Sequence, residues 1–165
     1  MKSSTPLLRG VIAAVVCASA ASAIAMNDDA GTMSGAVLHQ PDKLDWKAGP
    51  ASLEKGSQFV VLEGDPSKEG PFVMRLKLPD GFQIRPHTHP KIERVTIVAG
   101  TFHLAMGEEL DRAHATVLQA GAYGFWPPGM VHTAWAEGET IVQLHGVGPW
   151  VINYVNPDDD PRQRR

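Results

Sequence analysis

Cysteine is almost absent: the 165-residue chain has one, Cys17, in an apolar run near its N-terminus. The run, residues 11–24, follows a basic start and ends at small residues, with cleavage expected after Ala23 or Ala25. This layout predicts a secretory signal peptide over residues 1–25 and an exported, periplasmic or extracellular protein. The exported chain would then contain no disulfide and no thiolate ligand for a metal. An uncleaved anchor is the alternative, but the run is short and alanine-rich for a membrane-spanning helix.

Positive charge is also scarce. Without Lys2 and Arg9 the exported chain keeps 13 of the 15 Lys and Arg residues against 18 Asp and Glu, a net charge of −5. The basic residues are scattered except in the polar C-terminal tail, residues 157–165, which we expect to be a solvated end. A specific anionic ligand at that tail is the alternative. The composition therefore predicts no nucleic-acid partner and, after signal cleavage, no membrane partner.

Long amphipathic helical patterns are missing as well. Short apolar or alternating runs separated by Gly and Pro turns begin near residue 58, a pattern typical of all-β barrels and sandwiches. Only residues 107–114 could form a short helical turn. Residues 26–57 have little strand pattern and are predicted to form an N-terminal arm beside a barrel of residues 58–156. Strands are expected at residues 59–63, 72–78, 82–89, 93–98, 101–106, 115–118, 122–126, 132–136, 140–145 and 150–155.

Four side chains form a pattern suited to metal binding. His87 and His89 are two residues apart, and Glu93 follows after four more. Because side chains alternate across a strand, these even spacings predict that all three lie on one face of one strand. His132 follows a Pro-Pro-Gly turn and would supply a fourth ligand. Three imidazoles and a carboxylate can hold a divalent first-row metal and leave coordination positions open. Each could instead be an ordinary surface or core residue.

The same positions resemble the two motifs of the cupin superfamily. The first motif is matched in full by Gly81, His87, His89, Glu93 and Gly100. The second is matched by Gly121, Pro127, Gly129 and His132, with Ala136 where the family has asparagine. The resemblance implies a double-stranded β-helix, or jelly-roll, barrel that carries a metal on these histidines and the glutamate. It also implies a homodimer. The missing asparagine affects hydrogen bonding around the site rather than the ligand set.

Further polar side chains are candidates for contacting a bound molecule. Arg85 shares strand parity with the histidines and could clamp a carboxylate, or it could lie exposed at the barrel rim. Gln143 and His145 would reach the cavity if the odd positions of residues 140–145 face inward. The remaining candidates at the barrel mouth are Tyr154 and Trp126. The histidines expected to be exposed or to face away from the core are His39, His103 and His114.

These residues leave three classes of function open. The leading hypothesis is a mononuclear metal-dependent enzyme, plausibly an oxygenase, that acts on a small oxygen-rich molecule. The second is a non-catalytic cupin that binds a metal or a small ligand, and the third is a structural oligomer with a vestigial site. The donor set is compatible with iron, manganese, nickel, copper or zinc. No decisive general base is apparent beyond the metal ligands.

Overall fold

The computed structural model of the protein describes residues 35–164. The predicted signal peptide, residues 1–25, lies outside these residues, as does the first part of the predicted arm. Residues Leu38–Arg165 form one compact unit, which contains all the strands. No helix of the described residues is long and apolar enough to cross a membrane.

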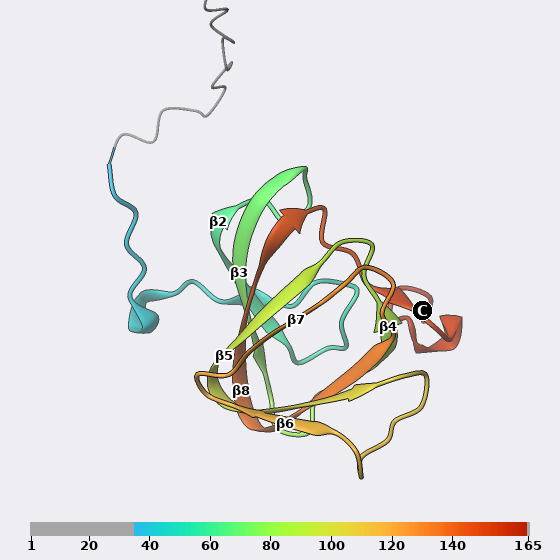
Figure 1. The fold of residues 1–165 in the computed structure, drawn as a ribbon. Helices are drawn as coiled ribbons and strands as arrows, with labels where there is room; N and C mark the ends of the chain where they lie inside the picture. Colours follow the sequence, from blue (N-terminus) through green and yellow to red (C-terminus); the bar gives the residue numbers. More distant parts are fainter. Residues whose placement is uncertain (1–34, 165) are drawn as a thin grey trace, which may run out of the picture. The chain divides into compact units, whose positions relative to one another are not determined.

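The predicted all-β fold is confirmed (Figure 1). All strand pairs are antiparallel, and two short 3₁₀ turns, Pro41–Lys43 and Pro157–Asp159, flank the sheet. The strands are β1 (Lys47–Ala48), β2 (Gln58–Gly64), β3 (Gly70–Leu78), β4 (Gln83–Thr88), β5 (Glu93–Met106), β6 (Thr116–Gln119), β7 (Tyr123–Trp126), β8 (His132–Gly148) and β9 (Asn153–Tyr154).

Two long strands, β5 and β8, hold the barrel together. The first half of β8 pairs with β4 and with the second half of β5. The second half of β8 lies between β3 and the first half of β5. The sequence predicts two shorter strands in place of β5 and two in place of β8, whereas each is one continuous strand in the structure. In β5 the strand continues through an irregular step at Ala99–Thr101. Each long strand therefore contributes to two parts of the nine-stranded sheet of the described residues (Figure 1).

The core fills the interior of the barrel through strand alternation. In β3 every second side chain is buried: Phe72, Met74, Leu76 and Leu78. Val142 and Leu144 of β8 and Val95 and Ile97 of β5 face the same interior. Burying one such large apolar side chain contributes about 1.5–3 kcal/mol. This packing stabilises the barrel in the absence of any disulfide.

Several local expectations differ from the structure. Residues 107–114 form bends rather than a helical turn. Of the strand expected over residues 150–155, only Asn153–Tyr154 pairs, with β4. The segment before it leaves the sheet: the backbone N–H of Trp150 donates to the carbonyl of Pro66. The peptide group of Trp150 is thus used in a contact outside the ladder.

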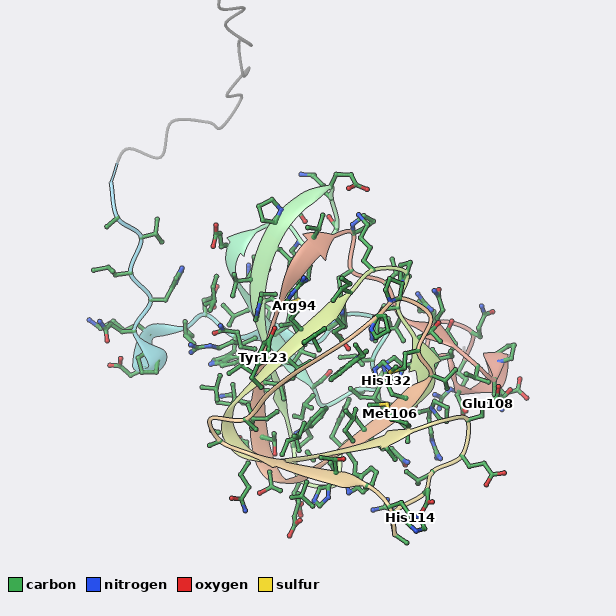
Figure 2. All side chains as sticks on the ribbon, in the orientation of Figure 1. Arg94, Met106, Glu108, His114, Tyr123 and His132 are labelled. Atoms are coloured by element: carbon green, nitrogen blue, oxygen red, sulfur yellow. The ribbon has the colours of Figure 1, made fainter. Side chains whose placement is uncertain are left out.

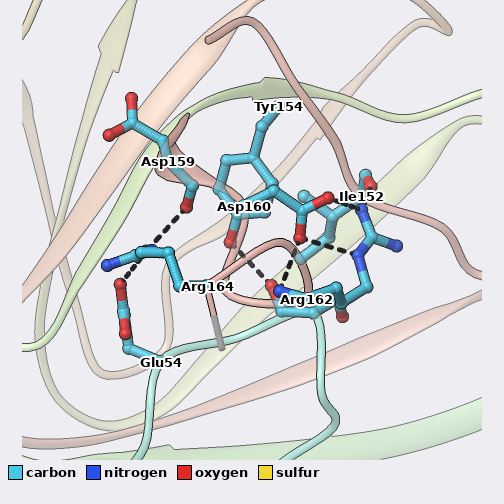
Figure 3. Close-up of polar contacts among 8 residues, drawn as sticks. Glu54, Ile152, Tyr154, Asp159, Asp160, Arg162 and Arg164 are labelled. Atoms are coloured by element: carbon cyan, nitrogen blue, oxygen red, sulfur yellow. Dashed lines mark hydrogen bonds and ion pairs between the residues drawn. The ribbon is translucent and has the colours of Figure 1, made fainter. Parts of the chain in front are cut away.

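The C-terminal tail is held against the barrel rather than fully solvated (Figure 3). Asp160 is buried and forms a two-point ion pair with Arg162, with N–O distances of 2.8 and 2.9 Å. Arg162 also donates to the carbonyl of Ile152 at 2.9 Å. Arg164 pairs with Glu54 near the N-terminal end of the barrel. The acidic and basic residues of the tail therefore attach it to two distant segments.

Candidate metal centre

The structure brings the four predicted ligands together inside the barrel. His87, His89, Glu93 and His132 are all buried, and one donor atom from each lies within 4.8 Å of the others. Figure 2 labels His132 among the side chains enclosed by the strands. His132 begins β8 and is the direct partner of His87 in β4, with ring centroids 4.2 Å apart. The cluster could hold a metal ion.

The break expected between residues 89 and 93 is confirmed, so the prediction that the even spacing places Glu93 on the same strand face as the two histidines was wrong. β4 ends at Thr88, His89 follows it, and Glu93 is the first residue of β5. The two strands do not pair with each other among the described residues, but both pair with β8. Residues 90–92 turn the chain between them, so the even spacing does not carry a strand face from His89 to Glu93. Pairing with a common third strand brings the carboxylate to the imidazoles.

Backbone carbonyls orient all three imidazoles in the same way. Nδ1 of His87 lies 2.7 Å from the carbonyl of Arg85, and Nδ1 of His132 lies 3.0 Å from that of Met130. His89 Nδ1 lies 2.7 Å from the carbonyl of Val151. Because a carbonyl only accepts, the network assigns the proton of each ring to Nδ1. In the neutral rings the three Nε2 atoms are then unprotonated, the form that binds metals.

Two of these nitrogens have no hydrogen-bond donor among the described residues. Nε2 of His89 and of His132 are buried and make no hydrogen bond there. Both face Oε2 of Glu93, at 3.1 and 3.5 Å. With the neutral rings, three buried acceptor atoms converge, an arrangement that is costly unless a cation or proton lies among them. The residues therefore fit a divalent metal.

Two indoles hold the carboxylate of Glu93. Nε1 of Trp126 donates to Oε2 at 3.1 Å, and Nε1 of Trp150 donates to Oε1 at 3.0 Å. The sequence suggested Trp126 as a pocket residue but Trp150, which is 57 residues from Glu93, only as a core or subunit contact. Neutral donors on both oxygens favour the ionised carboxylate.

Burial and charge set the protonation of the cluster. Burial lowers the pKa of His87 to about 3, helped by the neighbouring His132 and His89. Burial by itself raises the pKa of Glu93, but positive charge on the adjacent His89 and His132 in their protonated forms outweighs it and holds that pKa below its ordinary range. A neutral imidazole and an ionised carboxylate are the forms that coordinate a cation.

The cavity beside the cluster is small and apolar. About 20 Å³ of it is accessible to water-sized molecules, little more than the roughly 10–15 Å³ that one water needs. His87, Glu93 and His132 line it together with Trp126 and Trp150. The rest of the lining is Leu76, Ile84, Val95, Phe102, Leu104, Ala134, Val142, Leu144 and Ile152. The space suits a metal with one or two very small ligands.

The four tentative pocket residues lie outside this lining. Arg85 is exposed, with Nε 4.0 Å from Asp159. Tyr154 donates its hydroxyl to the carbonyl of Ser52 at 2.6 Å, and burial raises its pKa to about 12.

The other two tentative residues lie on β8. Val142 and Leu144 are the inward residues there, so Gln143 and His145 lie on the opposite face. Gln143 accepts a hydrogen bond from Arg75. The ring of His145 stacks beside that of Tyr123 and lines a smaller second cavity with His89 and Glu93.

The other histidines are outside the cluster. His39 and His114 are exposed, and His114 pairs with Asp111 at 2.6 Å. His103 stacks on Trp135, with ring centroids 4.9 Å apart, and pairs with exposed Glu137. These placements agree with the outward positions expected from the sequence.

Comparisons with known proteins agree with the fold. The sequence profile of the ChrR cupin-like domain matches residues 34–151. No curated protein matches the sequence. Among solved structures, the polyketide cyclase RemF from Streptomyces resistomycificus is similar over 76% of this chain and 89% of its own, with 14% identity and a TM-score of 0.61.

Two further solved structures are similar. An acetylacetone dioxygenase from Acinetobacter johnsonii has 15% identity and a TM-score of 0.58, covering 79% of this chain and 83% of its own. An RmlC-like cupin from Shewanella frigidimarina has 15% identity and a TM-score of 0.51, covering 75% of this chain and 96% of its own. At these identities the likeness concerns the fold.

Proposed function

This chain belongs to the ChrR cupin-like domain family, and on that premise we propose that it is a mononuclear metal-dependent enzyme, oxygenase-like, acting on a small oxygen-rich molecule. The observation that carries the proposal is that the buried Nε2 atoms of His89 and His132 both face Oε2 of Glu93, at 3.1 and 3.5 Å, and that neither nitrogen has a hydrogen-bond donor among the described residues. Two structural relatives, an acetylacetone dioxygenase and a polyketide cyclase, support a small oxygen-rich substrate.

Each ligand has a defined part in the proposed centre. His87, His89 and His132 would bind the ion through Nε2, because Nδ1 of each ring is engaged by a backbone carbonyl. Glu93 would bind it through a carboxylate whose negative charge offsets that of the cation. The ion, when bound, supplies a Lewis acid and, if it is redox-active, a partner for dioxygen.

The apolar walls would keep water away from the bound molecule. Phe102, Leu104 and Ile152 line the cavity and offer no hydrogen bond from their side chains. A substrate could therefore be recognised by its metal-chelating oxygens and by its small size. A substrate larger than a few atoms would need the walls to move, since the accessible volume is about 20 Å³.

That small volume also favours a second candidate, a non-catalytic metal-binding cupin. Besides the ligands, the only side-chain hydrogen-bonding groups in the described cavity lining are the Trp126 and Trp150 indole N–H groups, both of which donate to Glu93. No additional side chain there offers a general base. In a binding protein, only substitution of the metal ligands would abolish function. In an enzyme, substitution of groups that contact the substrate would abolish it as well.

Metal analysis with an activity screen would test both candidates. The wild-type protein and His132→Ala would be purified without chelator or added metal and analysed by mass spectrometry. Near one iron, manganese, nickel or copper per chain, lost in the variant, supports the metal centre. Oxygen consumption with small diols, enols or β-dicarbonyls then supports the enzyme, and its absence with full metal occupancy supports the binder. Zinc would direct the screen to non-redox reactions. Metal at the same level in both proteins would contradict the site.

Export and dimer formation are further parts of the proposal. Residues 1–25 would direct the protein to the periplasm or the exterior, and intact-mass analysis of the secreted protein would locate the cleavage site. A homodimer is expected from the cupin resemblance. Exposed aromatic side chains on β7, Tyr123 and Phe125, are compatible with such an interface. Light scattering of the purified protein would give the oligomeric state, and a monomer would contradict this part.

A further inference from the structure

The segment after β8 contacts two of the four ligands at once. The indole N–H of Trp150 donates to Oε1 of Glu93 at 3.0 Å. The carbonyl of the next residue, Val151, lies 2.7 Å from Nδ1 of His89. Trp150 also stacks on the His89 ring, with centroids 5.7 Å apart and an interplanar angle of 24°. Two consecutive residues thus orient one ligand from β5 and one that follows β4.

The two oxygens of Glu93 have different surroundings. Oε2 faces the ligand nitrogens of His89 and His132, at 3.1 and 3.5 Å. Oε1 accepts the indole hydrogen bond from Trp150. Trp126 donates to Oε2, which has a second lone pair available for an ion. The carboxylate is therefore held so that one oxygen points into the cluster and the other is engaged outside it.

We propose that Trp150 is a positioning residue that holds Glu93 in single-oxygen coordination of the metal and keeps one coordination position free. A carboxylate released from Trp150 could turn and offer both oxygens, which would occupy an additional position on the ion. This inference rests on the proposed metal centre and adds which side chain sets its coordination number.

The location of Trp150 also fits this role. Its side chain lines the inner cavity, the smaller cavity beside His89 and a surface groove that includes Pro66 and Met74. Its backbone N–H is fixed by the carbonyl of Pro66 at 2.7 Å. The indole is thus placed between the ligands and the surface by a contact that does not involve the ligands.

Metal titration of Trp150→Phe tests the inference. Phenylalanine keeps an aromatic ring against His89 but removes the N–H donor. The metal-free wild-type and variant proteins would be titrated with Zn²⁺ against a competing chelator and with Co²⁺ followed by visible absorption. We expect Zn²⁺ affinity to fall about 10–100-fold, as for other groups that orient a ligand. We also expect weaker Co²⁺ absorption, because a higher coordination number lowers the intensity of its d–d bands.

Two control variants isolate the effect. Trp46→Phe changes a tryptophan that lies under Lys77, away from the cluster, and should leave affinity and spectrum as in wild type. In a Glu93→Gln background, Trp150→Phe should add little, because it acts through the carboxylate. Unchanged Zn²⁺ affinity and Co²⁺ spectrum in Trp150→Phe would overturn the inference while leaving the metal centre intact. A wild-type protein that binds neither ion would overturn the proposed function and this inference together.

A measurement on the wild-type protein covers the case in which the variant does not fold. The indole N–H resonance of Trp150 in the ¹⁵N-labelled, Zn²⁺-loaded protein should be protected from hydrogen exchange and shift on metal addition. The resonance of Trp46 should do neither. Rapid exchange at Trp150 in the loaded protein would show that the indole does not hold Glu93 and would overturn the inference.

Discussion

Glu93 and Trp126 are direct partners in the β5–β7 ladder, and their side chains also meet: the indole Nε1 donates to the carboxylate at 3.1 Å. Cross-strand partners on one face have their Cβ atoms about 4.5–5.5 Å apart, which suits this contact. The same strand pairing that forms the barrel therefore orients a proposed metal ligand. His87 and His132 repeat this relationship between β4 and β8.

Replacing Glu93 by glutamine should weaken metal retention. The change removes the negative charge that offsets the cation and keeps the size of the side chain, so we expect affinity to fall about tenfold or more. Metal content after dialysis and competition with a chelator would measure this loss. Glu137→Gln, at an exposed position on β8, is the matched control and should retain metal. Equal occupancy in both variants would remove Glu93 from the ligand set.

Two glycines of the first cupin motif should differ in their tolerance of alanine. Gly100 and Gly81 have φ angles of +77° and +71°, so alanine at either position costs about 1–2 kcal/mol in backbone strain. A Cβ at Gly100 would also lie 2.8 Å from the Cα of Thr140, whereas the space at Gly81 is open. We expect Gly100→Ala to lose about 1–3 kcal/mol more than Gly81→Ala in urea unfolding. Equal losses would show that the bend in β5 relaxes at no cost.

Restoring the family's asparagine at position 136 should destabilise this protein. Ala136 is 2% exposed, belongs to the apolar core and pairs with Phe102. An asparagine amide there would overfill the core and bury unpaired polar atoms, at a cost of about 1–3 kcal/mol for each effect. Thermal unfolding would measure it, with Ala120→Asn in an exposed turn as the control. An unchanged melting temperature would reveal a polar niche at this position.

Asp160, in the C-terminal tail, should make the free energy of unfolding depend on pH in the acid range. Arg162, with a smaller contribution from Arg164, holds the pKa of Asp160 below its ordinary value of 3.8. A lowered folded-state pKa contributes stability that is full above the unfolded pKa and is lost as pH falls through the folded one. Asp160→Asn should therefore cost about 1–3 kcal/mol near pH 7 and less below pH 4.

Urea unfolding between pH 3 and pH 7 would compare Asp160→Asn with Asp158→Asn. The carboxylate of Asp158 is in the same turn, is exposed and makes no ion pair with the described residues. The Asp158 variant should follow wild type at every pH. Parallel curves for all three proteins would contradict a stabilising role of the Asp160–Arg162 pair.

Some elements could be predicted from the sequence because they depend on local spacing. The alternating runs of β3 and the glycine turns predict strands and hairpins, since alternation and φ preferences act over a few residues. The His-x-His pair and the histidine after Pro-Pro-Gly predict a metal-binding face for the same reason. The predictions for residues 1–25 remain predictions from sequence.

Other elements could not be predicted from spacing. Periodicity indicates that residues 140–145 alternate, but both sets of positions mix polar and apolar side chains, so the buried face was ambiguous. Packing against β3 and β5 buries Val142 and Leu144 and places Gln143 and His145 on the opposite face of the strand, where both are half-buried. The interior of the barrel selects the apolar set because burying Val142 and Leu144 is favourable, whereas burying Gln143 would take its amide away from Arg75.

The candidate ligands, the β class of the fold and the turns that separate its strands could all be identified from the amino-acid sequence. That Trp150 and Val151 orient two of the ligands is visible only in the folded structure. The difference lies in how far apart along the sequence the interacting residues are. Strand alternation and turn preferences are properties of neighbouring residues, whereas these contacts join residues 57 and 62 positions apart and exist only once the sheet has closed around the core.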